Sequence, residues 1–242
     1  MLAPKVHFRV RIISEEQKMK KPYIICHMMS SVDGRIDCKM LESMPGEEYY
    51  STLDSLHGDG FISGRNTAEL EMALPGRFEG KTRDVKEDFF SKKTDKKGFD
   101  IVIDTNGVLR YAHRGEEDAP LLIVTSRKVT REYLEYLDKE NISYIVCGEE
   151  HVDLKKACQI LLKEFHLERL CVVGGPYING AFLKEGLLDE VSIVIGSGID
   201  GRSGWEGVFE GVDEKHGVYH LKTTHVEWFK ESGAVWITYS LN

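Results

Sequence analysis

The most informative part of the sequence is residues 170–183, which read LCVVGGPYINGAFL. The apolar residues at 170–173 are typical of a buried strand, and the glycine pair that follows is typical of a strand that turns directly into a helix. Such a junction suits a pyrophosphate, because glycines let the phosphate approach the main chain and a helix N-terminus offers unpaired N–H groups. The glycines alone are equally compatible with a plain tight turn. No Gly-x-Gly-x-x-Gly fingerprint is expected in the sequence, which disfavours an ordinary Rossmann domain.

Strands and amphipathic helices alternate on both sides of this junction. The charged segment 77–97 interrupts the alternation and is expected to be a loop or a short surface helix. The pattern predicts an α/β fold with a central, mostly parallel sheet flanked by helices, and two β-rich runs at the end predict a C-terminal antiparallel hairpin. The expected strands are 23–29, 61–64, 99–104, 120–125, 143–147, 169–173, 191–195, 219–230 and 234–240, and the expected helices are 46–56, 66–74, one opening at 129–130, one capped by Asp153 and one ending at 184.

Length and charge limit the classes of function. The 242 residues with 41% hydrophobic content suit one domain, which we place at 22–242 after an N-terminal extension at 1–21. The net charge of -8 argues against nucleic acid, and no apolar run is long enough for a membrane span. The 5 cysteines are widely spaced in apolar surroundings, which predicts reduced core thiols, no metal site and a cytoplasmic location.

A second candidate site follows the expected strand at 120–125. Two hydroxyls and two cations would lie at its carboxyl end, where open α/β sheets bind ligands, and these belong to Thr125, Ser126, Arg127 and Lys128. Arg127 and Ser126 together could hold a ribose 2′-phosphate and so select NADPH over NADH. The other interpretation is a solvated loop followed by a helix cap.

Two further strand ends carry polar residues. Gly64, Arg65 and Thr67 repeat the order of strand, glycine and helix start, and could form a second anion contact. Asp104 ends another strand, where it is either a cofactor contact or the first residue of an ordinary turn.

These segments occur in an order that resembles a known family. The loop at 30–37 reads SSVDGRID and comes first. It is followed by the glycine-arginine-x-threonine segment and then by the strand ending at Arg127. The glycine pair and the stretch GLLDEV at 186–191 come last. The chain resembles the C-terminal reductase domain of bacterial riboflavin-biosynthesis deaminase/reductases, as a stand-alone member of the dihydrofolate-reductase-like superfamily. The resemblance implies a dihydrofolate-reductase-like fold, NADPH as hydride donor, a homodimer and reduction of 5-amino-6-(5-phosphoribosylamino)uracil or a similar ribosylaminopyrimidine.

The resemblance also assigns residues. The glycine pair matches the pyrophosphate site, Thr125 to Arg127 match the segment near the 2′-phosphate, Thr67 matches a cofactor-binding threonine, and Asp33 with Ser31 matches the substrate loop. A partly enclosed carboxyl such as Asp33 can have a raised pKa and act as the proton donor, with Glu47 or Glu48 as the alternative. Asp33 is equally compatible with a turn residue before Gly34. The expected cofactor-binding set is Gly64, Arg65, Thr67, Asp104, Thr125, Ser126, Arg127, Val173, Gly174, Gly175, Pro176 and Asn179.

The sequence departs from the family at one place. The riboflavin enzymes carry a Gly-Thr run that ends in Asp-Pro, whereas residues 64–71 here read GRNTAELE. Reduction of a pterin or another conjugated imine or carbonyl therefore remains an alternative, as does a dinucleotide-binding protein without turnover. Edge strands and the region of Trp205, Trp228 and Trp236 are the surface expected to form the homodimer.

Overall fold

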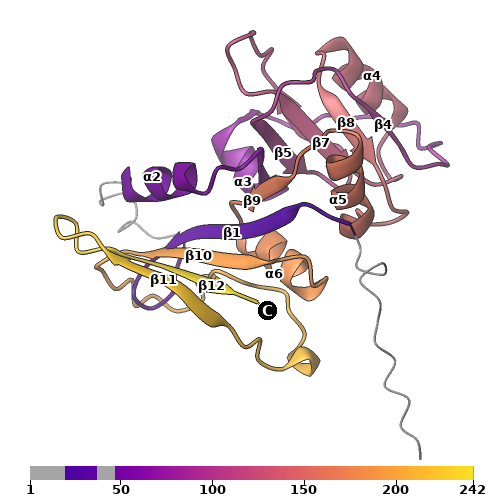
Figure 1. Ribbon diagram of the computed structural model, residues 1–242. Coiled ribbons are helices and arrows are strands. Elements are labelled where there is room, and N and C mark those ends of the chain that lie inside the picture. Colours follow the sequence, from indigo (N-terminus) through magenta and orange to yellow (C-terminus); the bar gives the residue numbers. More distant parts are fainter. Residues whose placement is uncertain (1–19, 37–46, 242) are drawn as a thin grey trace, which may run out of the picture.

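One large sheet organises the chain. The computed structural model describes residues 20–36 and 47–241, so all but the last two residues of the expected extension at 1–21 lie outside it. In this part of the chain, ten strands form the main sheet in the order β11-β12-β10-β1-β9-β2-β5-β7-β8-β4 (Figure 1). The strands are β1 Tyr23–Ser30, β2 Gly60–Gly64, β4 Phe89–Ser91, β5 Phe99–Ile103, β7 Leu121–Thr125, β8 Ser143–Val146, β9 Arg169–Val172, β10 Glu190–Ile195, β11 Lys222–Trp228 and β12 Val235–Ser240.

The middle of the sheet is parallel and its edges are antiparallel. The strands from β10 through β8 pair in parallel, whereas β12 pairs antiparallel with both β10 and β11, and β4 pairs antiparallel with β8. All parallel strands therefore end at one edge of the sheet, which gathers the loops that follow them. A separate small sheet pairs β3, Ala73–Leu74, with β6, Arg110–Tyr111.

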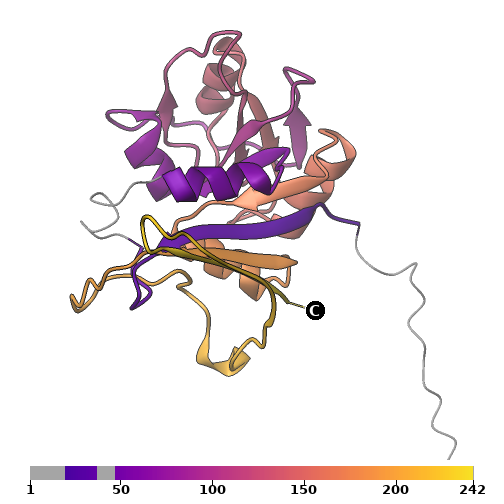
Figure 2. The same cartoon turned by 60° about the vertical axis from the view of Figure 1, so that its left-hand side comes forward.

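Helices cover both faces of the sheet. Alternate residues of β1 separate the two sides, because Cys26 packs in the core with Phe182 of α6 whereas Ile25 packs with Leu56 beside α2. Figure 2 shows β1 lying between α2 and α6. The core that contains Cys26 also holds α5, and α3 and α4 pack on the other face against β5 and β7. The helices are α2 Glu47–Ser55, α3 Arg65–Glu71, α4 Arg131–Lys139, α5 Leu154–Lys163 and α6 Pro176–Lys184.

The expected α/β class, the mostly parallel sheet and the terminal hairpin are confirmed. The Asp153 cap is confirmed too, since its carboxylate accepts the Lys156 N–H at 3.0 Å. The charged segment 77–97 was predicted as loop or helix, and that prediction is wrong at Phe89–Ser91, which pairs with β8 as an edge strand. The predicted helix at 66–74 ends at Glu71, because the next residues pair with β6.

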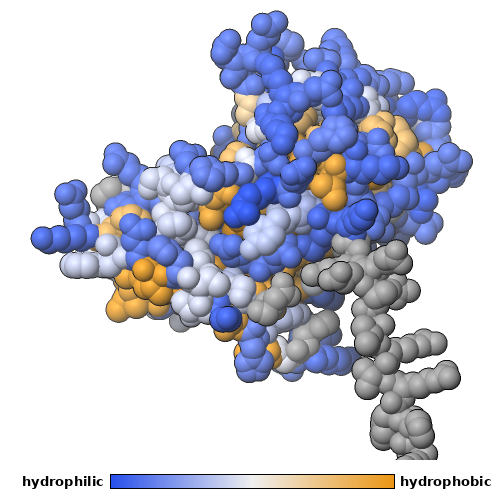
Figure 3. All heavy atoms as spheres, viewed as in Figure 1, coloured by the Kyte–Doolittle hydropathy of each residue, from blue (hydrophilic) through white to orange (hydrophobic). Residues whose placement is uncertain are grey.

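Two features of the described residues concern hydrophobicity. None of the helices in this part of the chain combines the length and apolar character of a membrane span. The surface in Figure 3 is largely hydrophilic, with apolar side chains in separate patches.

Candidate functional site

A cavity lies at the edge where the parallel strands end. Its volume is about 770 Å³, which is within the range of small-molecule and cofactor sites. The lining comes from the loops after β2, β5, β7, β8 and β9, together with one residue of the long segment before β4. The lining residues are Gly64, Arg65, Asn66, Arg83, Ile103, Thr105, Asn106, Lys128, Glu150, His151, Gly175, Pro176, Tyr177 and Ile178.

The glycine pair joins β9 to α6 beside this cavity, and Gly175 lines it. The Gly174 carbonyl accepts the Gly64 N–H at 2.8 Å, so the ends of β9 and β2 lie against each other. A Cβ on Gly175 would lie 3.2 Å from Thr67 Oγ1, which is closer than an ordinary contact, so a side chain here would displace that hydroxyl by a few tenths of an ångström. The structure thus brings together Gly64, Thr67 and Gly175 at the N-terminus of α6, with Pro176 as a cavity-lining residue in the first turn.

Arg65 supplies a positive charge next to the glycine pair. Its Nε is buried and has no hydrogen-bond partner among the described residues, although Arg65 lines the cavity. Burial raises the pKa of the Asp104 carboxyl. The nearby charge of Arg65 lowers this pKa, but by less than burial raises it. Asp104 Oδ2 accepts the N–H groups of Val108 and Leu109, at 2.6 and 2.9 Å, so this side chain organises its own turn.

Thr125, Ser126 and Arg127 are placed differently from the cavity-lining residues. The hydroxyls of Thr125 and Ser126 are buried and both donate to the Thr105 carbonyl, at 2.9 and 2.8 Å. The Arg127 guanidinium lies 3.6 Å from Asp88 and 3.8 Å from Glu149, outside the cavity. These residues hold the shape of the loops after β5 and β7, and the residue after Arg127 reaches the cavity instead.

The end of the cavity beyond β7 is rich in cationic and polar side chains. Arg83, Lys128 and His151 line it, and sequence analysis did not select Arg83 or His151. Lys128 Nζ lies 2.6 Å from Glu150 Oε1, which is the one carboxylate among the described lining residues. No described residue forms an ion pair with Arg83, which leaves its charge available for an anion.

Backbone contacts fix the loops that carry these groups. The Arg127 N–H donates to the Gly148 carbonyl at 2.9 Å, which ties the loop after β7 to the loop after β8. Gly148 has a φ of 87°, and a Cβ there would lie 2.1 Å from the His151 carbonyl oxygen. Only glycine allows the second loop to close so tightly on itself. Lys128, Glu150 and His151 are therefore presented by two mutually braced loops.

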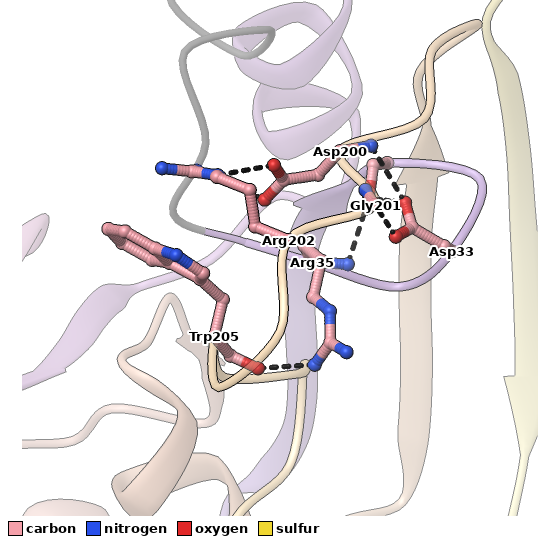
Figure 4. A network of polar contacts seen from close by, with 7 residues as sticks. Asp33, Arg35, Asp200, Gly201, Arg202 and Trp205 are labelled. Atoms are coloured by element: carbon pink, nitrogen blue, oxygen red, sulfur yellow. Dashed lines mark hydrogen bonds and ion pairs between the residues drawn. The ribbon is translucent and has the colours of Figure 1, made fainter.

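Asp33 lies in the loop after β1. In the strand order of the sheet, β9 separates β1 from the strands that carry these cations. Its carboxylate accepts the Ser31 hydroxyl at 2.7 Å and the N–H groups of Asp200 and Gly201 at 3.0 Å each (Figure 4). The Ser31 hydrogen bond first, and then the two backbone N–H groups, lower the pKa of Asp33 to about 2. This is the opposite of the raised pKa expected from the sequence, so the expectation of a carboxyl protonated near neutral pH is wrong.

The hydrogen bonds of Asp33 are part of a wider contact between the loop after β1 and the loop after β10. Arg35 donates to the Trp205 carbonyl, and the Arg202 guanidinium lies 3.8 Å from the centre of the Trp205 ring (Figure 4). Residues 196–201 of the second loop have the Gly-x-Gly-x-x-Gly spacing, so the expectation that this spacing is absent from the sequence is wrong. That loop follows β10 without opening a helix, and two of its N–H groups serve Asp33, so the spacing does not mark a phosphate site here.

The remaining candidates do not line the cavity. Asn179 is buried and its side chain donates a hydrogen bond to the Val208 carbonyl at 2.8 Å. It therefore anchors α6 to the segment between β10 and β11. Val173 pairs with the Ile62 carbonyl and Gly174 lies beside Met28. Glu47 and Glu48 begin α2, and one carboxylate oxygen of Glu48 is buried without a described partner.

A buried histidine on β1 was not anticipated. His27 is completely buried, its Nδ1 lies 2.9 Å from Ser192 Oγ, and its Nε2 lies 3.1 Å from the Tyr49 carbonyl. Trp236 Nε1 donates to the same Ser192 oxygen at 2.8 Å, so the serine hydroxyl is free to donate to Nδ1. The ring is thus a neutral Nε2–H tautomer, and burial lowers the pKa of His27 to about 4.

The cavity residues fit a dinucleotide. Glycine at 175 leaves space beside the α6 N-terminus for a pyrophosphate, and Arg65 offers a buried Nε with no described partner. The far end presents cations suited to a further phosphate. The substrate would then lie toward Asp33, on the opposite side of the glycine pair from Lys128.

The chain is similar to known proteins. The family described as RibD C-terminal domain matches residues 22–234. Two curated proteins named 2,5-diamino-6-ribosylamino-4(3H)-pyrimidinone 5′-phosphate reductase are similar to shorter segments. The one from Aquifex aeolicus is 32% identical over 81 residues, which are 32% of this chain and 34% of that protein. The one from Saccharomyces cerevisiae is 32% identical over 92 residues, 36% of this chain and 35% of that protein.

The chain therefore spans about a third of the length of the curated relatives it matches. Among solved structures, a pyrimidine reductase-like protein from Corynebacterium diphtheriae superposes with a TM-score of 0.66 at 16% identity, covering 90% of this chain and 91% of that one. The expected dihydrofolate-reductase-like fold is confirmed by this likeness, which at such identity concerns the fold alone.

Proposed function

The chain belongs to the RibD C-terminal domain family, and from this membership and the cavity we propose that it is an NADPH-dependent reductase of a ribosylaminopyrimidine 5′-phosphate. The observation that carries the proposal is the cavity at the carboxyl edge of the sheet. It combines a glycine pair at a helix N-terminus with cations at its far end. The candidate substrates are 5-amino-6-(5-phosphoribosylamino)uracil and its 2,5-diamino-pyrimidinone counterpart.

In this proposal the cofactor crosses the glycine pair. The pyrophosphate lies at Gly174 and Gly175, where the α6 N–H groups and Arg65 offset its charge. The adenosine end extends over β5 and β7, and its 2′-phosphate is bound by Lys128 and Arg83. Geometry favours Lys128 over Arg127 for this contact, because Arg127 is engaged by Asp88 and Glu149.

The substrate end lies at the loop after β1. Bound NADPH supplies a hydride, and reduction of the ribose carbon to a ribityl chain also takes up one proton. The Asp33 carboxylate is a poor proton donor, since its pKa is lowered to about 2 by Ser31 and the two N–H groups. We propose that Asp33 positions the substrate loop by holding Asp200 and Gly201, and that the proton comes from solvent.

A substrate panel tests the proposal. The purified chain is mixed with NADPH and, in turn, with each ribosylaminopyrimidine 5′-phosphate, the dephosphorylated ribosides and dihydropterins, while NADPH consumption is followed. We expect turnover with at least one ribosylaminopyrimidine 5′-phosphate and little with the others. Turnover confined to pterins would replace the proposed substrate class, and tight NADPH binding without any turnover would favour a dinucleotide-binding protein.

We propose a homodimer formed through the exposed edge strand β11, where the side chains of Val226 and Trp228 are 61% and 63% exposed. Four cysteines of the described residues are buried free thiols, which suits a reducing, cytoplasmic compartment. We propose a small-molecule substrate and no nucleic-acid partner, on the net charge of -8. A sedimentation mass that stays at 27.5 kDa would contradict the dimer.

A further inference from the structure

The carboxylate of Glu150 stands where the proposed cofactor would place its most negative group. Glu150 lines the cavity in the loop after β8, next to His151 and opposite Lys128. It is the one carboxylate among the described lining residues, and its Oε1 lies 2.6 Å from Lys128 Nζ. The amine that would bind a phosphate is therefore already paired with an acid.

The position along the cavity identifies the adenosine ribose as the neighbour of this pair. The glycine pair lies between β9 and β2, the substrate loop follows β1 on one side, and Lys128 and Glu150 follow β7 and β8 on the other. A dinucleotide whose pyrophosphate lies at the glycine pair and whose nicotinamide faces Asp33 places its adenosine half toward β7 and β8. The brace between Arg127 N–H and the Gly148 carbonyl keeps the two loops together there.

Lys128 and Glu150 have opposite preferences for the two nicotinamide cofactors. A 2′-phosphate gains a charged contact from Lys128, but it suffers repulsion from the Glu150 carboxylate and must compete with it for the amine. A ribose 2′-OH, by contrast, can donate a hydrogen bond to a carboxylate, as it does in dinucleotide sites that select NADH. One acidic side chain therefore disfavours NADPH and accommodates NADH.

We infer that Glu150 is a specificity-determining residue, which limits the preference of this cavity for NADPH and keeps NADH as a usable second cofactor. This inference rests on the proposed function. The side chain of Glu150 is 64% exposed and that of Lys128 is 39% exposed, so solvent screens the interaction. We therefore expect a modest effect of about two- to fivefold on affinity, the size typical of an exposed charge pair.

The test is equilibrium titration of NADPH and NADH into the full chain, followed by the quenching of protein fluorescence. Glu150→Gln should bind NADPH about two- to fivefold more tightly and NADH no more tightly than the wild type, and the gain should shrink as salt is raised. Glu149→Gln is the matched control, because it removes the same charge one residue away. The Glu149 side chain is 80% exposed, pairs with Arg127 and does not line the cavity.

The outcomes separate this inference from the proposed function. An unchanged NADPH:NADH affinity ratio in Glu150→Gln, or an equal change in Glu149→Gln, would overturn the role of Glu150 even if the enzyme reduces its substrate. A shifted ratio in a protein that reduces no ribosylaminopyrimidine would support Glu150 and refute the proposed reaction. If the wild type binds neither dinucleotide, both proposals fail.

Discussion

Two adjacent cations, Arg127 and Lys128, have different surroundings, and this difference can be measured. Lys128 lines the cavity, so Lys128→Met should weaken NADPH binding by about 1–2 kcal/mol, near the lower end for a charged hydrogen bond because the amine is partly exposed. NADH binding should change little, since it has no 2′-phosphate. Fluorescence titration with both cofactors measures the two effects.

Arg127→Met is the matched control for this change. It removes the same charge from the neighbouring position, where the guanidinium pairs with Asp88 and Glu149. We expect a loss of stability with an almost unchanged NADPH:NADH affinity ratio. A larger loss of NADPH affinity in Arg127→Met than in Lys128→Met would restore Arg127 as the phosphate ligand, as the sequence had suggested.

Asp33 tests whether the substrate loop is positioned or is itself the acid. Asp33→Asn removes a charged acceptor shared by Ser31 and the Asp200 and Gly201 N–H groups, so the loop should loosen and KM for the pyrimidine should rise. NADPH affinity should be unchanged. A positioning residue predicts that kcat keeps its pH profile, whereas loss of a proton donor would lower kcat by roughly 10²- to 10⁴-fold and remove one limb of that profile.

The lowered pKa of Asp33 also predicts a pH dependence of stability. The folded carboxyl has a pKa of about 2, whereas the ordinary pKa of an aspartate is 3.8. The folded state therefore keeps its charge while the unfolded chain takes up a proton, and the stabilisation, complete above pH 3.8, is lost as the pH falls toward 2. Urea unfolding of wild type and Asp33→Asn should differ most at neutral pH and converge in this window.

Individual site residues were predictable where the chain itself places them at a strand end. Gly64 ends β2, Arg65 follows it, and Gly175 and Pro176 come shortly after β9, and all four line the cavity. Arg83 does not follow a strand of the main sheet, so no local pattern indicated its position. No local pattern indicated which of Arg127 and Lys128 would line the cavity, because this depends on partners that are distant in the sequence.

The junction of β9 with α6 is the element that the cofactor proposal depends on most. Gly175→Val should abolish NADPH binding, because the new side chain would fill the space beside the α6 N-terminus and press on Thr67 Oγ1, 3.2 Å from a Cβ. Thermal unfolding should show that the variant remains folded, and Gly175→Ala should have a smaller effect. NADPH affinity near the wild-type value in folded Gly175→Val would leave this junction as a plain turn.

The packing of α2 on β1 and β10 predicts a second pH dependence through His27. Burial lowers the pKa of His27 from 6.5 to about 4. As the pH falls below 6.5, the unfolded chain takes up a proton that the folded protein refuses until about pH 4, so stability decreases across this window. The decrease should be about 3 kcal/mol, since each unit of pKa difference corresponds to about 1.4 kcal/mol.

His27→Gln removes this titration and provides the comparison. Urea unfolding at several pH values should show a flatter profile for His27→Gln than for the wild type between pH 6.5 and 4. His220→Gln is the control, because His220 is exposed and should leave the profile unchanged. Identical profiles for wild type and His27→Gln would mean that the ring is protonated in the folded protein.

Elements were predictable where periodicity was strong over several residues. The buried strands and the helix capped by Asp153 are long enough to show their pattern. The strand β4 has only three residues within a charged segment, and its pairing with β8 joins Phe89 to Val146 across 57 positions of the chain. β3 and β6 have two residues each, which is too short for any pattern to appear.

In the molecule as a whole, the proposed substrate site and the proposed site for the 2′-phosphate lie on opposite sides of the glycine pair. The strand order puts β1 and its Asp33 loop on one side of β9 and β2, and the cationic loops after β7 and β8 on the other. Alternation of strands and helices predicted a mostly parallel sheet, and hence a common edge for these loops. It did not determine the strand order, which depends on packing between segments distant in the sequence.

The central claim, that this cavity delivers a hydride to a ribosylaminopyrimidine 5′-phosphate, is tested most directly by isotope transfer. The chain is incubated with that substrate and NADPH carrying deuterium on the reactive face of nicotinamide C4, and the pyrimidine product is analysed by mass spectrometry. We predict a ribityl product that carries one deuterium on the former anomeric carbon, formed by wild type and not by Gly175→Val. Recovery of the substrate without deuterium, from wild-type protein shown to bind NADPH, would contradict the claim.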